Sequence, residues 1–303
     1  MGRSLAVLVV LYKSERFING LAECLKQQSY KDFDVHVLDC HEEQKSLRFF
    51  RGKYPGIKSY PYQGNLGYAG GNNFLYRQIM LQGGYSFTMV LNPDVILAKD
   101  AVEQLVILQR LTGCIGCGPI IFKGKPYNES EIQNYVIKAD YFKGRMIFPG
   151  NVAYNKNNLD VNKTELLSGT IFLIKNIFSQ CLFPDENYMY GEELDIGYRI
   201  NQLGGKNYVT SKSKVWHIHD FNGESNSAER LRYYYINRNR ILFFYRYRKY
   251  NSLFFSIIFE FIKLPARCLW VVKKKNARLL YAIYLGLFHG YLRRSGKYEK
   301  KIW

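Results

Sequence analysis

The chain has 303 residues and a formal net charge of +18, and 47% of its residues are hydrophobic, which is ordinary for a globular protein. This length fits one large domain, or one domain with an appendage, and leaves ample apolar material for a core. No stretch reaches the ~18 uninterrupted apolar residues of a transmembrane helix. The apolar run Leu5–Leu11 is too short for a secretory signal, so we expect a cytoplasmic protein.

The positive charge is concentrated at one end of the chain. Residues 231–303 contain 17 Lys and Arg against two acidic residues, a net charge of +15, whereas residues 1–230 carry only +3. We therefore predict two parts, a domain over residues 1–230 and a basic, aromatic helical tail over residues 231–303. The charge of the tail indicates an anionic partner.

The first part of the chain alternates between strand-like and helix-like patterns. Leu5–Leu11 is apolar throughout, as in a fully buried strand, and Phe33–Asp39 alternates as a second strand. Further strands are predicted over Ile57–Tyr60 and Ser86–Leu91, and helices over Glu15–Gln28, Ala69–Gln82 and Lys99–Leu111. This order predicts an α/β fold with a parallel sheet and right-handed crossovers.

The pattern loosens after Gly113. Residues 123–165 are polar and predict a long excursion or hairpin, residues 166–175 a strand, and residues 190–204 a helix with an acidic start. The six cysteines include one C-x-x-C pair, at positions 114 and 117, between strand-like flanks. Because no second pair accompanies it, we interpret the cysteines as small buried side chains rather than metal or redox groups.

Two aspartates are expected at one edge of the sheet. Asp39 ends a predicted strand, and Asp94 follows another in the run MVLNPDVIL, residues 89–97. Ligands of parallel α/β sheets bind at the carboxyl ends of the strands, so both carboxylates should lie at the ligand edge. Taken alone, Asp94 also fits a turn set by Pro93, with its carboxylate accepting backbone hydrogen bonds.

A glycine-rich loop and an acidic cluster add candidate groups. The loop GNLGYAGGNN, residues 64–73, precedes a helix start that favours a diphosphate, although it is neither a P-loop nor G-x-G-x-x-G. Glu192, Glu193 and Asp195 lie within four positions, and their repulsion raises at least one pKa, which suits a general base. The alternative is a solvated acidic helix start.

Two histidines complete the set of candidates. His217 and His219 lie on one face of a predicted strand, where an i, i+2 pair can chelate a metal ion. A structural role for one of them is the alternative.

These stretches resemble, in the same order, the motifs of the family-2 glycosyltransferases. Residues 5–39, LAVLVVLYKSERFINGLAECLKQQSYKDFDVHVLD, are similar to the opening of that family. GNLGYAGGNN resembles the Asn-x-Gly-x-x-Gly-Gly-Asn stretch of its rhamnosyltransferase-like branch, LNPDV that branch's variant of Asp-x-Asp, and YMYGEELDIGYRI its Gly-Glu-Asp-x-Asp helix. The resemblance covers residues 5 to about 225.

The sequence departs from the family pattern at two places. Asp39 is followed by Cys40, His41 and Glu42 where the family has Asp-Asn-Gly-Ser, and the pair Glu192-Glu193 stands where the family has Glu-Asp. In that family, the first position lies near the nucleobase of a nucleotide-sugar donor. The second carries the general base, whose side chain would here be one methylene longer.

The resemblance implies the GT-A fold, with a Rossmann-like, mostly parallel sheet, and an inverting mechanism that uses Mg²⁺ or Mn²⁺. It places the metal on Asp94 and His217 and the base on Glu193, with Asp195 as the second candidate and Glu192 or Asp195 orienting the loop or the acceptor. The donor-binding positions that it implies are Leu11, Tyr12, Asp39, Asn65, Gly70 and Asn92.

The expected reaction is transfer of a sugar from a nucleotide-diphosphate donor to a hydroxyl of a lipid-linked or polysaccharide acceptor in cell-surface glycan synthesis. Rhamnose is the family-level expectation for the sugar, and the inner face of the cell membrane is the expected location. Two alternatives stay open: a non-catalytic module that binds nucleotide sugars or polyanions, and a sugar nucleotidyltransferase.

The tail interleaves aromatic and basic residues, as in YYYINRNRILFFYRYRKY. Such segments suit helices that lie in a membrane interface and are attracted to anionic lipids. A plain helical bundle is the alternative. We do not expect a nucleic-acid partner, because the large Phe, Ile and Leu content favours hydrocarbon over phosphate.

Overall fold

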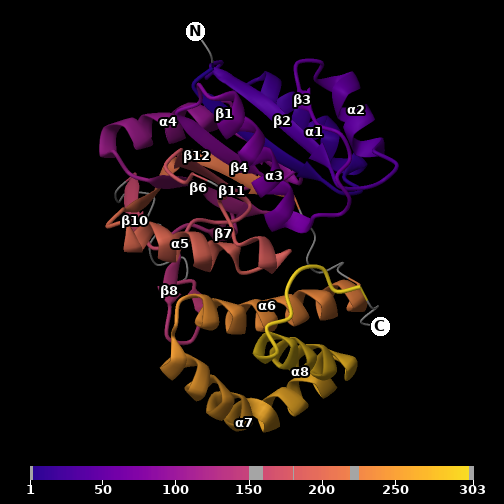
Figure 1. Cartoon of the computed structure of the whole chain (residues 1–303). Coiled ribbons are helices and arrows are strands. Elements are labelled where there is room, and N and C mark those ends of the chain that lie inside the picture. The colour runs from indigo at the N-terminus through magenta and orange to yellow at the C-terminus, as the bar shows by residue number, and fades with distance from the viewer. Residues whose placement is uncertain (1–2, 150–159, 180, 219–224, 300–303) are drawn as a thin grey trace.

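A mixed β-sheet forms the centre of the computed structural model, which describes residues 3–149, 160–179, 181–218 and 225–299 (Figure 1). Eight strands of this sheet lie side by side in the order β10 (Val161–Thr164), β12 (Asn207–His217), β6 (Gly116–Lys123), β11 (Ile171–Lys175), β4 (Phe87–Leu91), β1 (Leu5–Leu11), β2 (Phe33–Asp39) and β3 (Lys58–Ser59). In addition, β5 (Val95–Leu97) pairs with β12, and β7 (Ile132–Asn134) pairs with β6.

Helices cover both faces of the sheet. One face carries α1 (Glu15–Lys26), α2 (Lys45–Lys53) and α4 (Ala101–Thr112), and the other carries α3 (Gly67–Gln82) and α5 (Glu192–Gln202). The side chains of β1 alternate between the two cores: Val7 and Val9 pack on the first side, and Ala6 and Leu8 on the second. Because both faces are buried, β1 is apolar throughout, as its sequence predicts.

The strands of the sheet do not all run in one direction. The four strands in the order β3-β2-β1-β4 are parallel to one another. Strand β11 runs antiparallel to both of its neighbours, β4 and β6. The chain reaches β11 from β6 through an excursion that includes the hairpin of β8 (Lys138–Asp140) and β9 (Arg145–Ile147). The strand expected over residues 166–175 begins only at Ile171.

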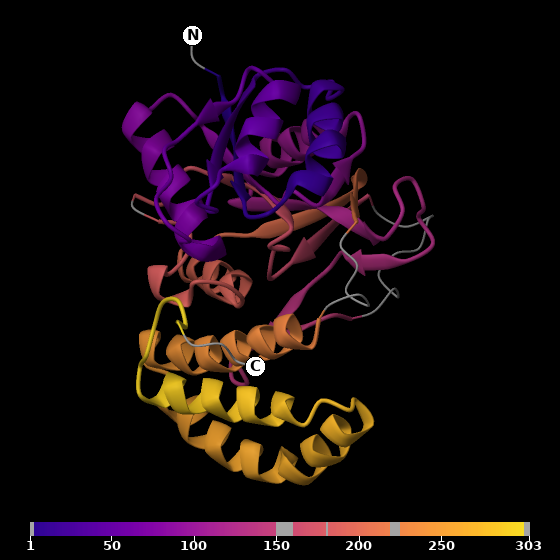
Figure 2. The ribbon, with the colours of Figure 1, turned by 90° about the vertical axis from the view of Figure 1, so that its right-hand side faces the viewer.

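Three helices lie at one end of the molecule: α6 (Asn226–Arg246), α7 (Tyr250–Lys273) and α8 (Arg278–Tyr291). Figures 1 and 2 show α6 between the sheet domain and the other two helices. Gly286 and Gly290 of α8 allow it to approach α6 closely, because a Cβ at either position would collide with the α6 backbone. Pro265 lies inside α7, which is bent in Figure 2.

Among the residues that the structure describes, no helix is both long enough and apolar enough to cross a bilayer. All six cysteines are free thiols, and both members of the C-x-x-C pair are buried.

Candidate active site

Two adjoining cavities open at the carboxyl ends of β1 and β4. The first, called the rim cavity, has a volume of about 560 Å³, and the predicted site residues in its lining are Tyr12, Asn65, Asn92 and Asp94. The second, called the carboxylate cavity, has a volume of about 360 Å³, and the predicted residues in its lining are Asn92, Asp94, Glu192, Glu193 and His217. Tyr68, Asn92, Asp94 and Met189 line both cavities, so the two form one connected site.

Three of the predicted donor-binding residues lie outside these linings. Leu11 is buried in the core, and Gly70 lies within α3. Asp39 is also buried, and its carboxylate accepts hydrogen bonds from the backbone N–H groups of His41 at 3.0 Å and Leu47 at 3.1 Å. In this structure the Asp39 carboxylate therefore holds the turn between β2 and α2.

The glycine-rich loop approaches the rim cavity through Gly67. This residue has a φ of +69° and lines the cavity, and a Cβ here would collide with the carbonyl oxygen of Tyr188. Asn65 accepts a hydrogen bond from the N–H of Gly67 at 3.2 Å. Asn73 has a different role, because its side chain bonds the backbone of Phe183 and anchors α3.

The predicted metal ligands are adjacent. Asp94 Oδ2 and His217 Nε2 are 3.3 Å apart, and the other ring nitrogen of His217, Nδ1, is 3.0 Å from Gln133 Oε1. An amide oxygen only accepts hydrogen bonds, so Nδ1 is the donor of the hydrogen bond to Gln133. Nε2 faces the carboxylate of Asp94, so the two groups are placed to serve as neighbouring ligands of one bound cation.

Among the described residues, Asp94 and His217 form a set of two adjacent ligands. No cluster of three or more His, Cys, Asp or Glu side chains that could hold a metal ion occurs in the described ranges. His219, the second histidine of the predicted pair, lies outside those ranges. Asp94 and His217 can thus supply two ligands, and diphosphate oxygens and water suit the other positions of Mg²⁺ or Mn²⁺.

Glu193 is held at the wall of the carboxylate cavity. Its carboxylate packs against Gly169, where a Cβ would lie only 2.6 Å from Glu193 Oε1. Tyr68 donates a hydrogen bond to the Gly169 carbonyl at 2.6 Å, which fixes this turn beside the cavity. Burial raises the pKa of Glu193, and hydrogen bonds from its own N–H and that of Gly169 lower it in part.

Glu192 has a different environment from its neighbour. Its side chain is buried, and burial together with the charge of Glu193 raises the pKa of Glu192 well above the ordinary value. The pKa of Glu193 is raised less, and backbone hydrogen bonds stabilise its charge. Glu193 is therefore the more acidic member of the pair and the better placed to act as the ionised carboxylate.

Asp195 faces away from both cavities. Its Oδ1 forms an ion pair with Arg246 of α6 at 2.7 Å, and its Oδ2 accepts a hydrogen bond from Asn187 at 3.2 Å. Burial raises the pKa of Asp195, and the Arg246 guanidinium opposes that shift. The geometry therefore gives Asp195 a role in joining α5 to the preceding loop and to α6.

That loop has an unusual backbone that α6 holds in place. Tyr188, Tyr190 and Gly191 all have positive φ, and Tyr188 and Tyr190 line the cavities. Asn239 of α6 donates hydrogen bonds to three carbonyls of the loop, at residues 187, 189 and 190. Buried Arg238 donates to the carbonyl of Asn187 at 2.7 Å and to that of Glu186 at 3.2 Å.

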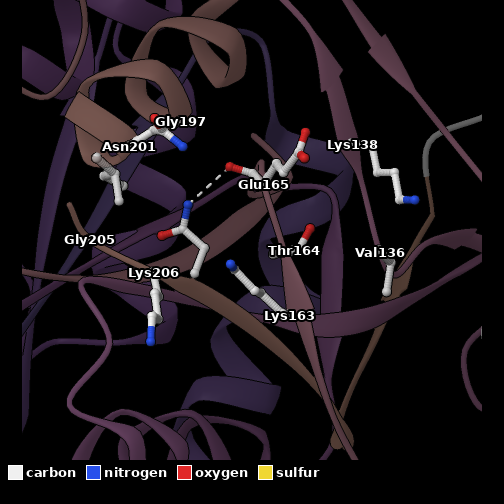
Figure 3. Close-up of a pocket in the computed structure, with 11 residues that line it drawn as sticks. Val136, Lys138, Lys163, Thr164, Glu165, Gly197, Asn201, Gly205 and Lys206 are labelled. Carbon is white, nitrogen blue, oxygen red and sulfur yellow. Dashed lines mark hydrogen bonds between the residues drawn. The ribbon is translucent and has the colours of Figure 1, made fainter. Parts of the chain in front are cut away.

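A third cavity, of about 270 Å³, lies apart from these groups (Figure 3). It is lined by lysines 138, 163 and 206 and by residues near the end of α5, and the Asn207 side chain donates to the Glu165 carbonyl at 3.1 Å. None of the predicted site residues belongs to its lining.

Sequence reasoning missed several residues of the site. Gln133 and Gly169 come from a polar excursion and from a segment expected to be strand, and neither has a periodic pattern that marks it. Lys13, Arg16 and Lys297 also line the rim cavity, and nothing in their neighbouring sequence distinguishes them from other surface cations.

Comparison with known proteins agrees with this architecture. No protein-family model matches the sequence. The low-salt glycan biosynthesis hexosyltransferase Agl10 of Haloferax volcanii is 24% identical over 316 residues, which cover 98% of this chain and 94% of that protein.

Two solved structures have similar folds. The crystal structure of S. aureus TarS 1–349 has a TM-score of 0.55 at 15% identity and covers 96% of this chain and 81% of that one. The crystal structure of GalNAc-T7 with UDP, GalNAc and Mn²⁺ has a TM-score of 0.54 at 15% identity and covers 80% of this chain. There the match spans about half of the neighbour, 47%. The chain therefore has the GT-A fold, which confirms the predicted fold class.

Proposed function

We propose that the protein is a glycosyltransferase of glycan biosynthesis, which transfers a hexose-type sugar from a nucleotide-diphosphate donor to an acceptor hydroxyl with inversion. The observation that supports this most directly is the connection of the two cavities at Asn92 and Asp94. The rim cavity has room and cations for a nucleotide diphosphate, and the carboxylate cavity presents a base. The likeness to Agl10, a named hexosyltransferase, supports the same reaction class.

The base in this proposal is Glu193. The acceptor hydroxyl enters the carboxylate cavity, and its oxygen attacks the anomeric carbon of the donor sugar. A new glycosidic C–O bond forms as the bond to the diphosphate breaks on the opposite side of that carbon, and Glu193 accepts the hydroxyl proton. Glu192 is buried beside it and has the more strongly raised pKa, which makes Glu193 the more acidic carboxylate of the two.

Asp94 and His217 are the proposed ligands of Mg²⁺ or Mn²⁺. Their 3.3 Å separation fits two neighbouring ligands of one ion. When bound, the ion neutralises charge on the leaving diphosphate. Gln133, whose Oε1 lies 3.0 Å from His217 Nδ1, orients the ring so that Nε2 faces Asp94. The GalNAc-T7 structure contains Mn²⁺, which is consistent with metal use in this fold.

The proposed acceptor is lipid-linked or a polysaccharide, and the proposed location is the inner face of the cell membrane. Helix α7 supports the membrane location, because several of its large apolar side chains are exposed: Phe254, Ile258, Phe261, Ile262, Leu269 and Val272. Basic residues flank the helix at both ends, and this combination suits an interface with anionic lipids. Rhamnose as the sugar rests on the sequence resemblance alone.

The test is hydrolysis and transfer with a panel of nucleotide sugars that includes dTDP-rhamnose, with Mn²⁺ or excess chelator. One nucleotide sugar should release its nucleoside diphosphate only in the presence of the metal. Glu193→Gln should then reduce transfer by ~10²-fold or more, because it keeps the shape but removes the basicity. Glu192→Gln is the matched control and should stay within a few-fold of wild type, since Gln mimics a protonated Glu.

Each alternative has its own outcome. Binding of a nucleotide sugar without any turnover would identify a binding module. Release of pyrophosphate from a nucleoside triphosphate and a sugar phosphate would identify a nucleotidyltransferase. Full transfer in excess chelator would remove the metal from the mechanism, and near-normal transfer by Glu193→Gln with an inactive Asp195→Asn would move the base.

A further inference from the structure

The segment after α8 returns to the active site. Figures 1 and 2 show it leaving α8 and passing over α6 toward the sheet domain. Lys297 and Tyr298 of this segment line the rim cavity together with Asn92 and Asp94. Lys297 therefore lies beside the carboxyl end of β4, next to the motif that contains Asn92 and Asp94.

Hydrogen bonds on both sides of Lys297 fix its backbone. Gly296 donates its N–H to the Glu186 carbonyl at 2.8 Å and accepts from the Arg238 guanidinium at 2.6 Å. The N–H of Tyr298 donates to the hydroxyl of Tyr235 at 2.8 Å. These partners belong to α6 and to the loop before α5, so the position of Lys297 is set by the same groups that shape the cavity wall.

The ring of Tyr298 adds packing to these hydrogen bonds. Its centroid is 4.8 Å from that of Tyr234 and 5.5 Å from that of His289. The backbone on either side of Lys297 is therefore held, while its side chain is exposed at the cavity.

The charges around the rim cavity favour an anion. Lys13 and Arg16 line it from the segment after β1, and Lys297 adds a third cation, whereas Asp94 is the one acidic residue among the described lining residues. Cations that converge on a cavity attract and bind phosphate groups. A lysine ammonium acts as a compact point charge with three donors, which suits non-bridging diphosphate oxygens.

We propose that Lys297 is a donor-binding residue whose ammonium contacts the diphosphate of the nucleotide sugar. This inference rests on the proposed function and adds to it a binding group from outside residues 1–230. In this arrangement the segment of residues 293–299 forms part of the donor site and not only an end of the helical tail.

The experiment measures binding of UDP, GDP, dTDP and ADP by titration calorimetry with Mn²⁺, on full-length protein. Lys297→Ala should weaken binding of the preferred nucleoside diphosphate about tenfold, the loss expected for one charge-assisted contact. Lys297→Arg should recover most of that affinity because the charge remains. Lys26→Ala, which removes an exposed cation at the end of α1, is the control and should bind as wild type does.

Comparison with the corresponding nucleoside monophosphate separates a diphosphate contact from a general charge effect. The affinity ratio of diphosphate to monophosphate should fall in Lys297→Ala and stay constant in Lys26→Ala. Equal affinities of Lys297→Ala and wild type would overturn the inference while leaving the proposed function intact. Failure of wild-type protein to bind any of the four diphosphates would overturn both.

Discussion

Among single residues, Gly169 determines where the carboxylate of Glu193 can lie. A Cβ at this position would sit 2.6 Å from Glu193 Oε1. Because that atom ends a flexible side chain, Gly169→Ala should displace the carboxylate and leave the fold intact. We expect sugar transfer to fall by ~10²-fold, the loss that about 1 Å of misplacement can cause, with little change in the unfolding midpoint.

The control for this substitution is Gly52→Ala in α2, where nothing lies within 4 Å of an added Cβ. Its transfer rate should equal that of wild type. An unchanged rate in Gly169→Ala would show that the contact with Glu193 does not position the base.

Glu192 provides a test through the pH dependence of stability. Burial and the charge of Glu193 raise its folded-state pKa well above the ordinary value for a glutamate, so the folded protein favours the protonated form. The stability that this group contributes is fully present below about pH 4.5 and is lost as pH rises through the folded pKa. Glu192→Gln removes this titration. The free energy of unfolding of the variant minus that of wild type should therefore be more positive at pH 8 than at pH 4.5.

Urea unfolding of both proteins at the two pH values measures this difference. Glu193→Gln should show a smaller change with pH, because the pKa of Glu193 is raised less than that of Glu192. A constant difference between Glu192→Gln and wild type from pH 4.5 to 8 would contradict a raised pKa at Glu192.

Among the helices, α7 is fixed to α6 by a buried carboxylate. Glu260 of α7 forms an ion pair with Arg240 of α6 at 2.8 Å. It forms a second ion pair with Arg267, about two turns further along α7. Removing one member of a buried ion pair leaves the remaining charges uncompensated and typically costs 3–5 kcal/mol. Glu260→Gln should therefore lower the free energy of unfolding by about 3 kcal/mol.

Denaturant unfolding of Glu260→Gln tests the role of this ion pair. Asp160→Asn is the control, since the pair of Asp160 with Lys212 is largely exposed and should contribute less than about 1 kcal/mol. Equal small effects of both substitutions would show that Glu260 does not hold α7.

Individual elements differ in how well the sequence predicts them. The strands β1 and β2 and the helices α1 and α3 follow from periodicity, because each buries a regular set of side chains. Helix α2 was not predicted, since its nine residues KSLRFFRGK bury only Ser46, Leu47 and Phe50. Strand β5 was also missed, because it has three residues directly after a turn.

The site shows the same division. Asp94, Glu193 and His217 were expected together, because each lies in a motif with a recognisable chemical pattern. The partners that orient them were not expected: Gln133 comes from an irregular segment, and α6 was interpreted as part of a separate basic tail. Charge counting treats Arg238 as one more surface cation, whereas its guanidinium is buried and bonds loop carbonyls.

For the whole molecule, the exposed face of α7 predicts association with membranes. Phe261 is 73% exposed and Leu269 is 68% exposed, so replacing both by Asp should not disturb the core. The double variant should lose binding to vesicles that contain phosphatidylserine, and wild-type binding should weaken as salt rises. Vesicle co-sedimentation with and without phosphatidylserine measures this binding.

Leu111→Asp in α4 is the matched control, because Leu111 is 81% exposed on a different helix. Substitution is preferable to truncation near residue 230, which would also remove the α6 groups that hold the loop before α5. Equal vesicle binding by the double variant and wild type would show that α7 is not the membrane contact.

The hydrogen bonds from Asn239 to the loop before α5 also bear on how the protein is made. Asn239 lies 52 positions after Asn187, and the segment that carries Lys297 follows later still. During synthesis the sheet can form while α6 is still inside the ribosome, but the loop with its left-handed residues lacks the partners that hold it. A nascent chain arrested before α6 emerges should therefore contain a folded sheet, but the loop that lines the two cavities should not yet be fixed in place.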